Sequence, residues 1–273
     1  VRDVEEVKRS VKDAVEIADL VNLYMFCGGT NFGFYNGANA YGKNYIIQHT
    51  SYSVDAPINE YGKRTEKYYA EREAICERTG KTPPLTACDP VLTEYGKAAY
   101  KAEMSLFDCL DEIAEKKFTV GLKNTESLGQ GFGYTVYQTR AIVRNIPDRP
   151  VIKLTLPEVK DFASVYVNGK FVKSFKRGYD ENREIVVAER GEITITIFVE
   201  NMGRVNHCDW ELLPDRKGLI GVMKLDGRIL FNYDCYLLPL DKLPVKIAGK
   251  AINEKPAFYE YTLFDKRINK DML

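Results

Sequence analysis

The stretch Val21-Asn-Leu-Tyr-Met-Phe26 is a short apolar run that stops abruptly at the pair Gly28-Gly29. Upstream of it, apolar residues recur at helical spacing with charged residues between them, which predicts an amphipathic helix: Val4, Val7, Val11, Ala14 and Ala18. A helix that feeds a buried strand ending at glycines is the repeating unit of a parallel α/β architecture. The first part of the chain is therefore predicted to be α/β.

Residues 28–64 follow, and they are rich in Gly, Asn and Tyr with little periodicity. A loop of this length after a strand is uncommon unless it has a function. Thr65 is a suitable N-cap for a helix that runs through Arg78, and Gly80 is a suitable residue to end it. We therefore place the end of the α/β region, residues 1–80, at this glycine.

The next part of the chain, residues 81–120, is predicted to be a connector. Prolines at positions 83, 84 and 90 interrupt regular structure, and a helix-like segment runs from Glu103 to Lys116. No compact domain is expected here.

After residue 120 the pattern is that of an all-β protein. Several short segments alternate at period two, and Asn168-Gly169 and Asp226-Gly227 have the composition of type I′ hairpin turns. This combination predicts a β-sandwich over residues 121–240. Residues 241–273 are expected to hold a linker and one further strand that begins near Pro256. The predicted fold class is α/β plus all-β.

The composition excludes some classes of function. The 39 Lys and Arg residues balance 39 Asp and Glu residues, which argues against a general nucleic-acid binder or a polybasic membrane anchor. No apolar run approaches the ~18 residues that a membrane-spanning helix needs. The six cysteines show no metal-like spacing. We therefore expect no metal and no cofactor, and a reducing, cytoplasmic location.

Several longer motifs follow one another along the chain, and they carry a family resemblance. In the α/β region they are Asn22-Leu-Tyr24-Met-Phe-Cys-Gly-Gly-Thr-Asn31-Phe-Gly-Phe-Tyr-Asn-Gly-Ala-Asn39, Thr50-Ser-Tyr-Ser-Val-Asp55-Ala-Pro-Ile-Asn-Glu-Tyr-Gly62 and Thr65-Glu-Lys-Tyr-Tyr69. These stretches closely resemble the β-galactosidases of glycoside hydrolase family 35.

The resemblance continues into the β region in the same order. Glu126-Ser-Leu-Gly-Gln-Gly-Phe-Gly-Tyr-Thr-Val-Tyr137 is similar to the entry of that family's first all-β domain. Glu200-Asn-Met-Gly-Arg-Val-Asn206 and Asp215-Arg-Lys-Gly218-Leu resemble its late strands. Pro256-Ala-Phe-Tyr259 resembles the opening of the next, galactose-binding-like jelly-roll domain.

The resemblance implies a fold for the α/β region. In that family a (β/α)8 barrel carries the active site at the C-terminal ends of its strands. Asn22–Phe26 would be the eighth strand, with residues 4–20 as the helix before it and residues 65–78 as the last helix. Such a strand needs the first and seventh strands as hydrogen-bond partners, so residues 1–80 are expected to be loosely ordered without them.

The resemblance also implies a catalytic apparatus that this chain does not contain. The family uses two glutamates, a general acid/base in a Glu-Asn-Glu-Tyr-Gly context and a nucleophile, and both are expected upstream of Val1. Glu60, in Asn59-Glu60-Tyr61-Gly62, copies the first context but follows a loop instead of a strand. Glu66 lies in the first turn of a predicted helix, where the helix dipole favours a carboxylate. No residue of this chain is therefore expected to be catalytic.

Three residues are candidates for contact with the sugar. The resemblance implies that Tyr24 lines the galactose pocket near the nucleophile; the alternative is a core aromatic on a buried strand. Asn31 and Asp55 are weaker candidates, because Asn and Asp in such loops often bind their own backbone instead. The family commonly reads Ser-Tyr-Asp-Tyr-Asp-Ala-Pro, and Val54 stands where its second tyrosine would contribute to the pocket.

The function implied is that of part of a retaining β-galactosidase acting on terminal non-reducing β-D-galactosyl residues. Its expected partners are a galactoside and the missing N-terminal barrel portion, with no nucleic acid and no membrane. Two alternatives stay open: a non-catalytic carbohydrate-binding or scaffold protein, and a family member with a different sugar preference. One His and one Cys, His207 and Cys208, do not make a metal site beside Trp210. The sandwich is expected to buttress the barrel.

Overall fold

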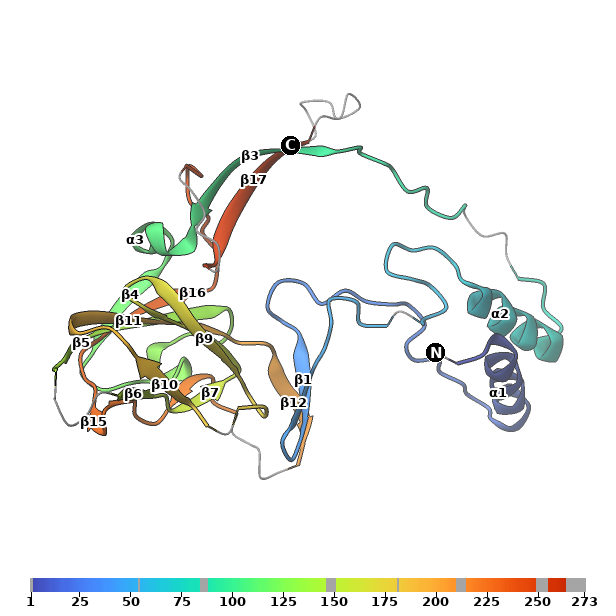
Figure 1. Ribbon diagram of the computed structural model, residues 1–273. Coiled ribbons are helices and arrows are strands. Elements are labelled where there is room, and N and C mark those ends of the chain that lie inside the picture. The colour runs from blue at the N-terminus through green and yellow to red at the C-terminus, as the bar shows by residue number, and fades with distance from the viewer. Residues whose placement is uncertain are drawn as a thin grey trace. The chain divides into compact units, whose positions relative to one another are not determined.

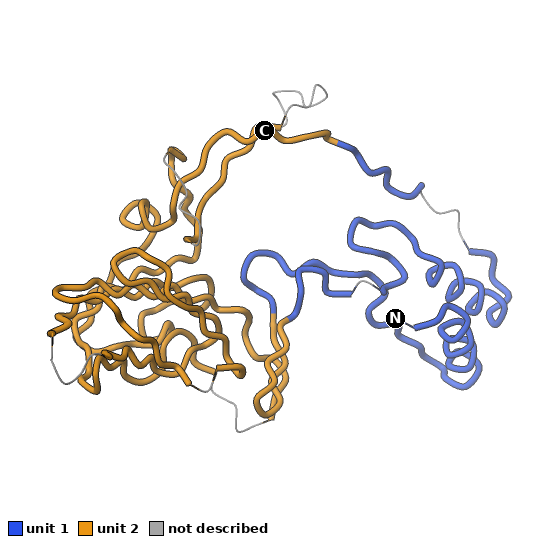
Figure 2. The backbone as a smooth tube through the Cα atoms, in the orientation of Figure 1, with its two compact units in different colours: residues 1–36, 48–94 blue, residues 37–47, 95–273 orange. Residues whose placement is uncertain are grey.

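The computed structural model describes residues 2–53, 55–83, 88–145, 151–180, 182–209, 215–248 and 255–263. The chain divides into two compact units, coloured separately in Figure 2. Unit 1 comprises residues 1–36 and 48–94, and unit 2 comprises residues 37–47 and 95–273. Most regular structure is β, with few helices.

Unit 1 contains the two helices that the sequence predicts. Helix α1 (Val4–Ile17) begins after Asp3, whose carboxylate accepts the backbone N–H groups of Glu5 and Glu6 at 2.9 and 3.3 Å. Helix α2 (Glu66–Thr79) follows Thr65 and ends at Gly80, which has a left-handed φ of 63°. The two helices contact each other. Both helix predictions are confirmed.

The strand predicted over residues 22–26 is wrong. These residues form a turn and irregular structure, and Cys27 makes only an isolated bridge to Ile58. A strand is stable when neighbouring strands take up its backbone hydrogen bonds, and no strand of the described residues flanks this segment. The apolar run alone does not form a strand without those partners.

Unit 2 is a β-sandwich, as the sequence predicts (Figure 1). One layer is a six-stranded sheet in the order β4-β16-β5-β11-β8-β9 and the other a four-stranded sheet in the order β10-β6-β14-β15. Their bounds are β4 (Glu115–Thr119), β5 (Tyr134–Val143), β6 (Ile152–Thr155), β8 (Phe162–Val167), β9 (Lys170–Lys176), β10 (Glu184–Val187), β11 (Gly191–Glu200), β14 (Lys224–Leu225), β15 (Arg228–Ile229) and β16 (Tyr233–Leu238). A small pair, β7 (Glu158–Lys160) with β13 (Gly218–Ile220), adjoins them.

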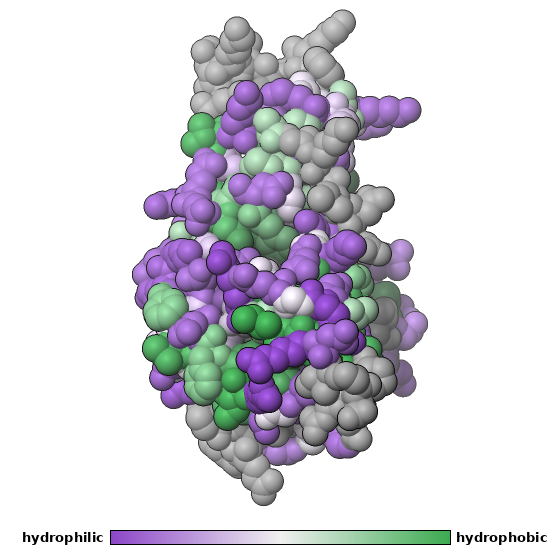
Figure 3. All heavy atoms as spheres, turned by 60° about the vertical axis from the view of Figure 1, so that its left-hand side comes forward, coloured by the Kyte–Doolittle hydropathy of each residue, from purple (hydrophilic) through white to green (hydrophobic). Residues whose placement is uncertain are grey.

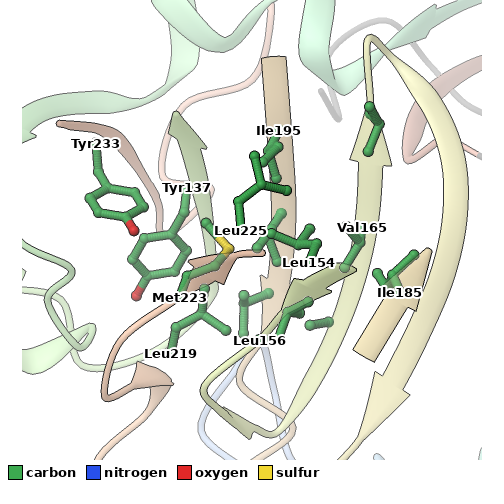
Figure 4. Close-up of a cluster of buried hydrophobic side chains, with 14 of the residues drawn as sticks. Tyr137, Leu154, Leu156, Val165, Ile185, Ile195, Leu219, Met223, Leu225 and Tyr233 are labelled. Atoms are coloured by element: carbon green, nitrogen blue, oxygen red, sulfur yellow. The ribbon is translucent and has the colours of Figure 1, made fainter. Parts of the chain in front are cut away.

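Alternating residues of the two sheets fill the core between them. Figure 4 shows Ile195 of β11 and Val165 of β8 from one sheet close to Leu154 of β6 from the other. All three side chains are fully buried. Outside the core, Figure 3 shows one face on which polar and charged side chains surround scattered apolar ones, as on most globular domains.

Both predicted hairpin turns are confirmed. Asn168 and Gly169 join β8 to β9 with φ values of 49° and 75°, and Asp226 and Gly227 join β14 to β15 with φ values of 48° and 79°. A type I′ turn needs a positive φ at both central residues, and Asn, Asp and Gly adopt it most readily.

The helix predicted over residues 103–116 is mostly wrong. The segment holds the end of β3 (Ala98–Ser105), the 3-10 helix η1 (Leu106–Asp108), the short helix α3 (Leu110–Ile113) and the start of β4. Strand β3 pairs with β17 (Ala257–Leu263), which follows the whole sandwich in sequence. This long-range pairing overrides the local helical pattern. The strand predicted to begin near Pro256 is confirmed by β17.

A third difference concerns residues 28–64, for which the sequence predicts a loop. They contain a hairpin of β1 (Gly37–Tyr41) and β2 (Asn44–Ile47), and β1 pairs in parallel with β12 (Arg204–Cys208). The hairpin therefore belongs to unit 2, although the expected domain limit at residue 80 places it with the α/β region. Its pairing partner is distant in sequence, so no local pattern indicated it.

Buried charges fasten this hairpin to the sandwich. Lys217 and Asp161 are fully buried, and the Lys217 Nζ lies 2.7 Å from Asp161 Oδ2 and 2.8 Å from Asp215 Oδ2. The Tyr45 hydroxyl of β2 also accepts a hydrogen bond from Lys217 Nζ, at 2.9 Å. Arg177 adds a second cation, 3.1 Å from Asp161 and 2.7 Å from Asp215. Two cations and two carboxylates thus neutralise each other.

The ionisation states of these buried groups depend on one another. Burial by itself favours a neutral acid, but Lys217 and Arg177 outweigh it and hold the pKa of Asp215 below its usual range. Burial and the neighbouring Asp161 raise the pKa of Tyr45, so its phenol stays protonated. Removal of one member would leave an uncompensated charge in the interior.

We expect Lys217→Met to destabilise the protein by about 3–5 kcal/mol, because Asp161 and Asp215 then lose the fully buried cation between them. Urea unfolding followed by circular dichroism measures the change. The matched control is Lys153→Met, which removes an exposed ion pair with Glu184 at 2.8 Å and should cost less than about 1 kcal/mol. Equal effects of the two substitutions would show that the buried cluster is not a principal source of stability.

Candidate functional site

The candidate site is an open pocket in unit 1 of about 470 Å³, within the range of small-molecule sites. Helices α1 and α2 form two of its walls, and residues 21–25 together with Ser53, Asp55 and Pro57 form the others. Its lining is apolar on the α1 side and polar near α2: Val7, Val11, Ala14, Val21 and Leu23, and Tyr24, Asp55, Lys67 and Glu71.

Tyr24 is the most exposed aromatic residue of this pocket, with 82% of its surface accessible. Its hydroxyl lies 3.2 Å from the hydroxyl of Tyr52, and either can donate the hydrogen bond. This hydrogen bond raises the pKa of Tyr24 above its ordinary value. The phenol therefore remains a neutral donor and acceptor at physiological pH, which suits contact with a sugar hydroxyl.

Asp55 lines the same pocket, but its carboxylate is already hydrogen-bonded. The Nζ of Lys67 donates to Asp55 Oδ2, and the backbone N–H of Arg2 donates to the same oxygen at 3.0 Å. The Lys67 hydrogen bond holds the pKa of Asp55 below its usual range. Asp55 is thus ionised at neutral pH and anchors its loop, so it offers no proton for acid catalysis there.

Glu71 lies one helical turn after Lys67 and also lines the pocket. Its side chain is buried, and its Oε2 has no hydrogen-bond partner among the described residues. Burial raises the pKa of Glu71, while Lys67 acts against that shift. A buried carboxyl oxygen without a hydrogen-bond donor destabilises the folded state. The Glu71 side of the pocket therefore lacks a polar partner among the described residues.

The loop that carries Tyr52 and Asp55 is fastened to the segment after Tyr24 by backbone hydrogen bonds. Gly28 N–H donates to Ile58 O at 2.7 Å, and Tyr52 N–H donates to Gly29 O at 2.8 Å. A Cβ at Gly28 would stand 2.7 Å from the carbonyl oxygen of Ser53, so only glycine permits this approach. The glycine pair thus brings Tyr24 and Tyr52 together.

Asn31 is not brought to the pocket. Its Nδ2 donates to the carbonyl oxygen of His49 at 2.7 Å, and its backbone N–H donates to Thr50 O at 2.7 Å. These two bonds give Asn31 a role in holding the loop, which is the alternative that the sequence left open.

The two glutamates that copy catalytic motifs are also elsewhere. Glu60 lies in a turn closed by a 3.0 Å bond from Gly62 N–H to Asn59 O, and Glu66 opens α2. Neither lines the pocket. Val54 and Trp210 lie outside the described residues.

Among the described residues, no group of three or more His, Cys, Asp or Glu side chains is placed to hold a metal ion. His207 bonds through Nδ1 to the Tyr41 hydroxyl at 2.9 Å, so it has a structural partner. Within the same described part of the chain, no helix has the length and apolar character to cross a membrane.

Sequence reasoning missed three residues of the site: Tyr52, Lys67 and Glu71. All three lie within or next to motifs quoted above, but no periodicity separates them from their neighbours. The i, i+4 spacing of Lys67 and Glu71 shows that they share a helix face. It does not show that this face borders a pocket, since that depends on how α2 packs.

Comparisons with known proteins agree with this description. Residues 1–77 match the family model of glycosyl hydrolases family 35, and residues 123–240 match that of the β-galactosidase first all-β domain. A β-galactosidase of Xanthomonas manihotis is 34% identical over 248 residues, covering 89% of this chain and 40% of its own length. The β-galactosidase of Bos taurus is 33% identical over 240 residues, covering 85% and 34%.

A further relative is the β-galactosidase-1-like protein 3 of Mus musculus, 30% identical over 276 residues, covering 94% of this chain and 40% of its own. This chain therefore spans well under half the length of each of these relatives. A solved β-glucuronidase of an uncultured Clostridium species matches 44% of this chain and 22% of its own, at 20% identity and a TM-score of 0.25, which supports no inference. The two family models match in chain order, so residues 1–77 resemble glycosyl hydrolases family 35 and residues 123–240 resemble the first all-β domain of β-galactosidase.

Proposed function

We propose that this chain is part of a retaining β-galactosidase that hydrolyses terminal non-reducing β-D-galactosyl residues. The resemblance to family 35 and the names of the relatives support the reaction class. In this proposal, residues 1–80 belong to the end of a (β/α)8 barrel and contribute a wall of the sugar site. Both catalytic glutamates come from a part of the barrel outside this chain.

The observation that carries the proposal is that Tyr24 lines the open pocket and that its hydroxyl is hydrogen-bonded to the Tyr52 hydroxyl. A phenol ring can pack against the apolar face of a sugar while its hydroxyl bonds a sugar hydroxyl. The hydrogen bond from Tyr52 fixes the orientation of the Tyr24 hydroxyl. The Tyr24 side chain therefore loses less conformational entropy when a sugar binds. The exposed Tyr24 ring is therefore a suitable wall for a galactoside.

The chemistry itself needs two carboxyl groups about 5–5.5 Å apart, one as nucleophile and one as acid and base. Asp55 does not serve, because Lys67 holds it as an ion pair. Glu71 does not serve either, because its Oε2 is buried. The role proposed for this chain is to bind and orient the sugar, with the sandwich of unit 2 as a buttress.

The 273-residue chain alone is expected to release no nitrophenol from nitrophenyl β-galactoside. Addition of the polypeptide encoded upstream of the Val1 codon should restore turnover, because it supplies both carboxyl groups. Turnover by the pure chain would overturn the proposal that they lie outside it. Specific binding of galactose in calorimetry without restored turnover would favour the non-catalytic carbohydrate-binding alternative.

In the reconstituted enzyme, Tyr24→Phe should lower kcat/KM about tenfold, because it removes one hydrogen bond to the sugar while keeping the ring. The matched control is Tyr61→Phe, which removes a phenol hydroxyl from a residue of the same loop region that does not line the pocket. Steady-state kinetics measure both. Equal kcat/KM values for wild type and Tyr24→Phe would exclude the Tyr24 hydroxyl from the site.

Lys67 is expected to hold the loop that carries Tyr52 in place without contacting the sugar itself. Lys67→Met should raise KM about tenfold with a smaller change in kcat, because the loop that carries Tyr52 loses its anchor at Asp55. Lys67→Arg should restore most of the loss, since it keeps the cation. Lys8→Met, which removes the more exposed Lys8–Glu73 ion pair at 2.7 Å, should leave KM unchanged.

The same anchor predicts a pH dependence. The lowered pKa of Asp55 means that the ion pair stabilises the loop at pH values above the usual carboxyl pKa of about 3.9. That stabilisation is lost as the pH falls through the lowered pKa. The protease sensitivity of residues 48–64 should therefore rise on acidification in the wild type and be independent of pH in Lys67→Met. The same increase at low pH in both proteins would contradict the role of the Lys67–Asp55 ion pair as an anchor.

A further inference from the structure

The chain passes from unit 1 into unit 2 and back within one loop. Residues 37–47 belong to unit 2, and the segments on both sides of them belong to unit 1 (Figure 2). The second of these segments carries Tyr52, whose hydroxyl is hydrogen-bonded to that of Tyr24 in the candidate site. Only residues 48–51 separate the hairpin from Tyr52, so the position of the hairpin bears on the site.

The hairpin is attached to the sandwich along its length. Strand β1 pairs in parallel with β12, and the two strands run side by side in Figure 1. Ala38, Ala40 and Tyr45 are buried together in one hydrophobic cluster. At the tip of the hairpin, a Cβ on Gly178 would stand 2.3 Å from the carbonyl oxygen of Lys43. Only glycine permits this approach, so the hairpin tip is closely packed.

Tyr45 is the most strongly held residue of the hairpin. Its hydroxyl accepts a hydrogen bond from Lys217 Nζ at 2.9 Å, donates to the carbonyl oxygen of Gly203, and lies 3.1 Å from Asp161 Oδ2. The guanidinium of Arg177 lies over its ring, 4.4 Å from the ring centroid. Displacement of Tyr45 would leave several buried polar groups without partners, which is strongly unfavourable.

The two segments that leave the hairpin stay joined as a ribbon, residues 29–36 with residues 48–52. The Asn31 side chain donates to His49 O and its backbone N–H donates to Thr50 O, both at 2.7 Å. The backbone N–H of Tyr52 then donates to Gly29 O at 2.8 Å. A continuous network of hydrogen bonds can carry a displacement from one end of a segment to the other. The ribbon therefore connects the hairpin to Tyr52.

The loop that carries Tyr52 thus has an anchor on each side of this residue. After Tyr52, Asp55 is held by Lys67 of α2, within unit 1. Before Tyr52, the hairpin is held through Tyr45, within unit 2. Tyr45 does not line the pocket, so any influence on the site is transmitted through the ribbon.

We propose that Tyr45 is a positioning residue for the sugar site. The sandwich holds the hairpin through Tyr45, and the ribbon transmits that position to Tyr52 and so to the hydroxyl of Tyr24. The effect on sugar binding rests on the proposed function, whereas the effect on the ribbon does not. The ribbon is then the part of residues 1–80 that keeps its order without the rest of the barrel.

The first test uses the 273-residue chain and needs no substrate. Tyr45→Phe should accelerate hydrogen exchange of the backbone amides of Asn31 and Tyr52 at least about fivefold, because the ribbon loses its fixed end. The matched control is Tyr233→Phe, which removes a buried hydroxyl bonded to Leu230 O at 2.9 Å in the core between the sheets. Equal acceleration in both variants, or no protection of these amides in the parent chain, would overturn the proposal.

A second variant disturbs the attachment without removing a polar group. Gly178→Ala places a methyl group against the carbonyl oxygen of Lys43 at the hairpin tip and leaves the buried charges unchanged. It should accelerate exchange at Asn31 and Tyr52 as Tyr45→Phe does. Unchanged exchange in Gly178→Ala would show that the position of the hairpin does not reach Tyr52.

The reconstituted enzyme provides the kinetic test. Tyr45→Phe should raise KM about fivefold and keep kcat within about twofold, because a displaced Tyr52 weakens sugar binding and leaves the reacting carboxyl groups in place. Tyr233→Phe should change neither value. In a Tyr24→Phe background, Tyr45→Phe should cause no further loss of kcat/KM, since Tyr45 acts through the Tyr24 hydroxyl. Additive losses would overturn the proposal.

The two measurements distinguish failure of the positioning role from failure of the proposed function. Accelerated exchange in Tyr45→Phe without turnover in the reconstituted wild type would confirm the coupling through the ribbon and contradict the enzymatic function. Unchanged exchange and unchanged KM in an active enzyme would contradict the positioning role and leave the function intact.

Discussion

The ion pair between Lys217 and Asp161 is the constraint on which unit 2 depends. Both side chains are fully buried, and a charge in that environment is tolerated only when it is paired and fully hydrogen-bonded. The Nζ of Lys217 donates hydrogen bonds to Asp161 and to the Tyr45 hydroxyl, and it forms an ion pair with Asp215 at 2.8 Å. Because Tyr45 comes from the hairpin of β1 and β2, this one cation joins a segment before the sandwich to strands inside it.

Unit 1 is held together in a different way. The Lys67–Asp55 ion pair joins α2 to the loop, and backbone bonds at Gly28 and Gly29 join that loop to the segment after Tyr24. Its pocket exposes Tyr24 and leaves a buried oxygen of Glu71 without a donor among the described residues. An open pocket with an unpaired buried carboxyl oxygen fits the proposed role of this unit as part of a larger barrel. In that barrel, further strands would face the same pocket.

Much of the fold could be predicted from the sequence, because it depends on local chemistry. Helix α2 ends at the predicted Gly80, and Asn168-Gly169 forms the expected turn, since these residues accept a positive φ. The site was predicted only in part. Tyr24 and Asp55 line one pocket, but Asn31 binds its own loop, and Lys67 gained its importance only when α2 placed it against Asp55.

The amino-acid sequence by itself indicated the family resemblance, the two helices of unit 1 and the alternating strands of the sandwich, because these follow from motifs and periodicity. Only the tertiary structure decided that residues 22–26 do not form a strand, that β3 pairs with β17, and that the hairpin at residues 37–47 belongs to the sandwich. The physical reason is common to all three. A strand is defined by the backbone that pairs with it, and no local pattern shows whether that partner exists or how far along the chain it lies.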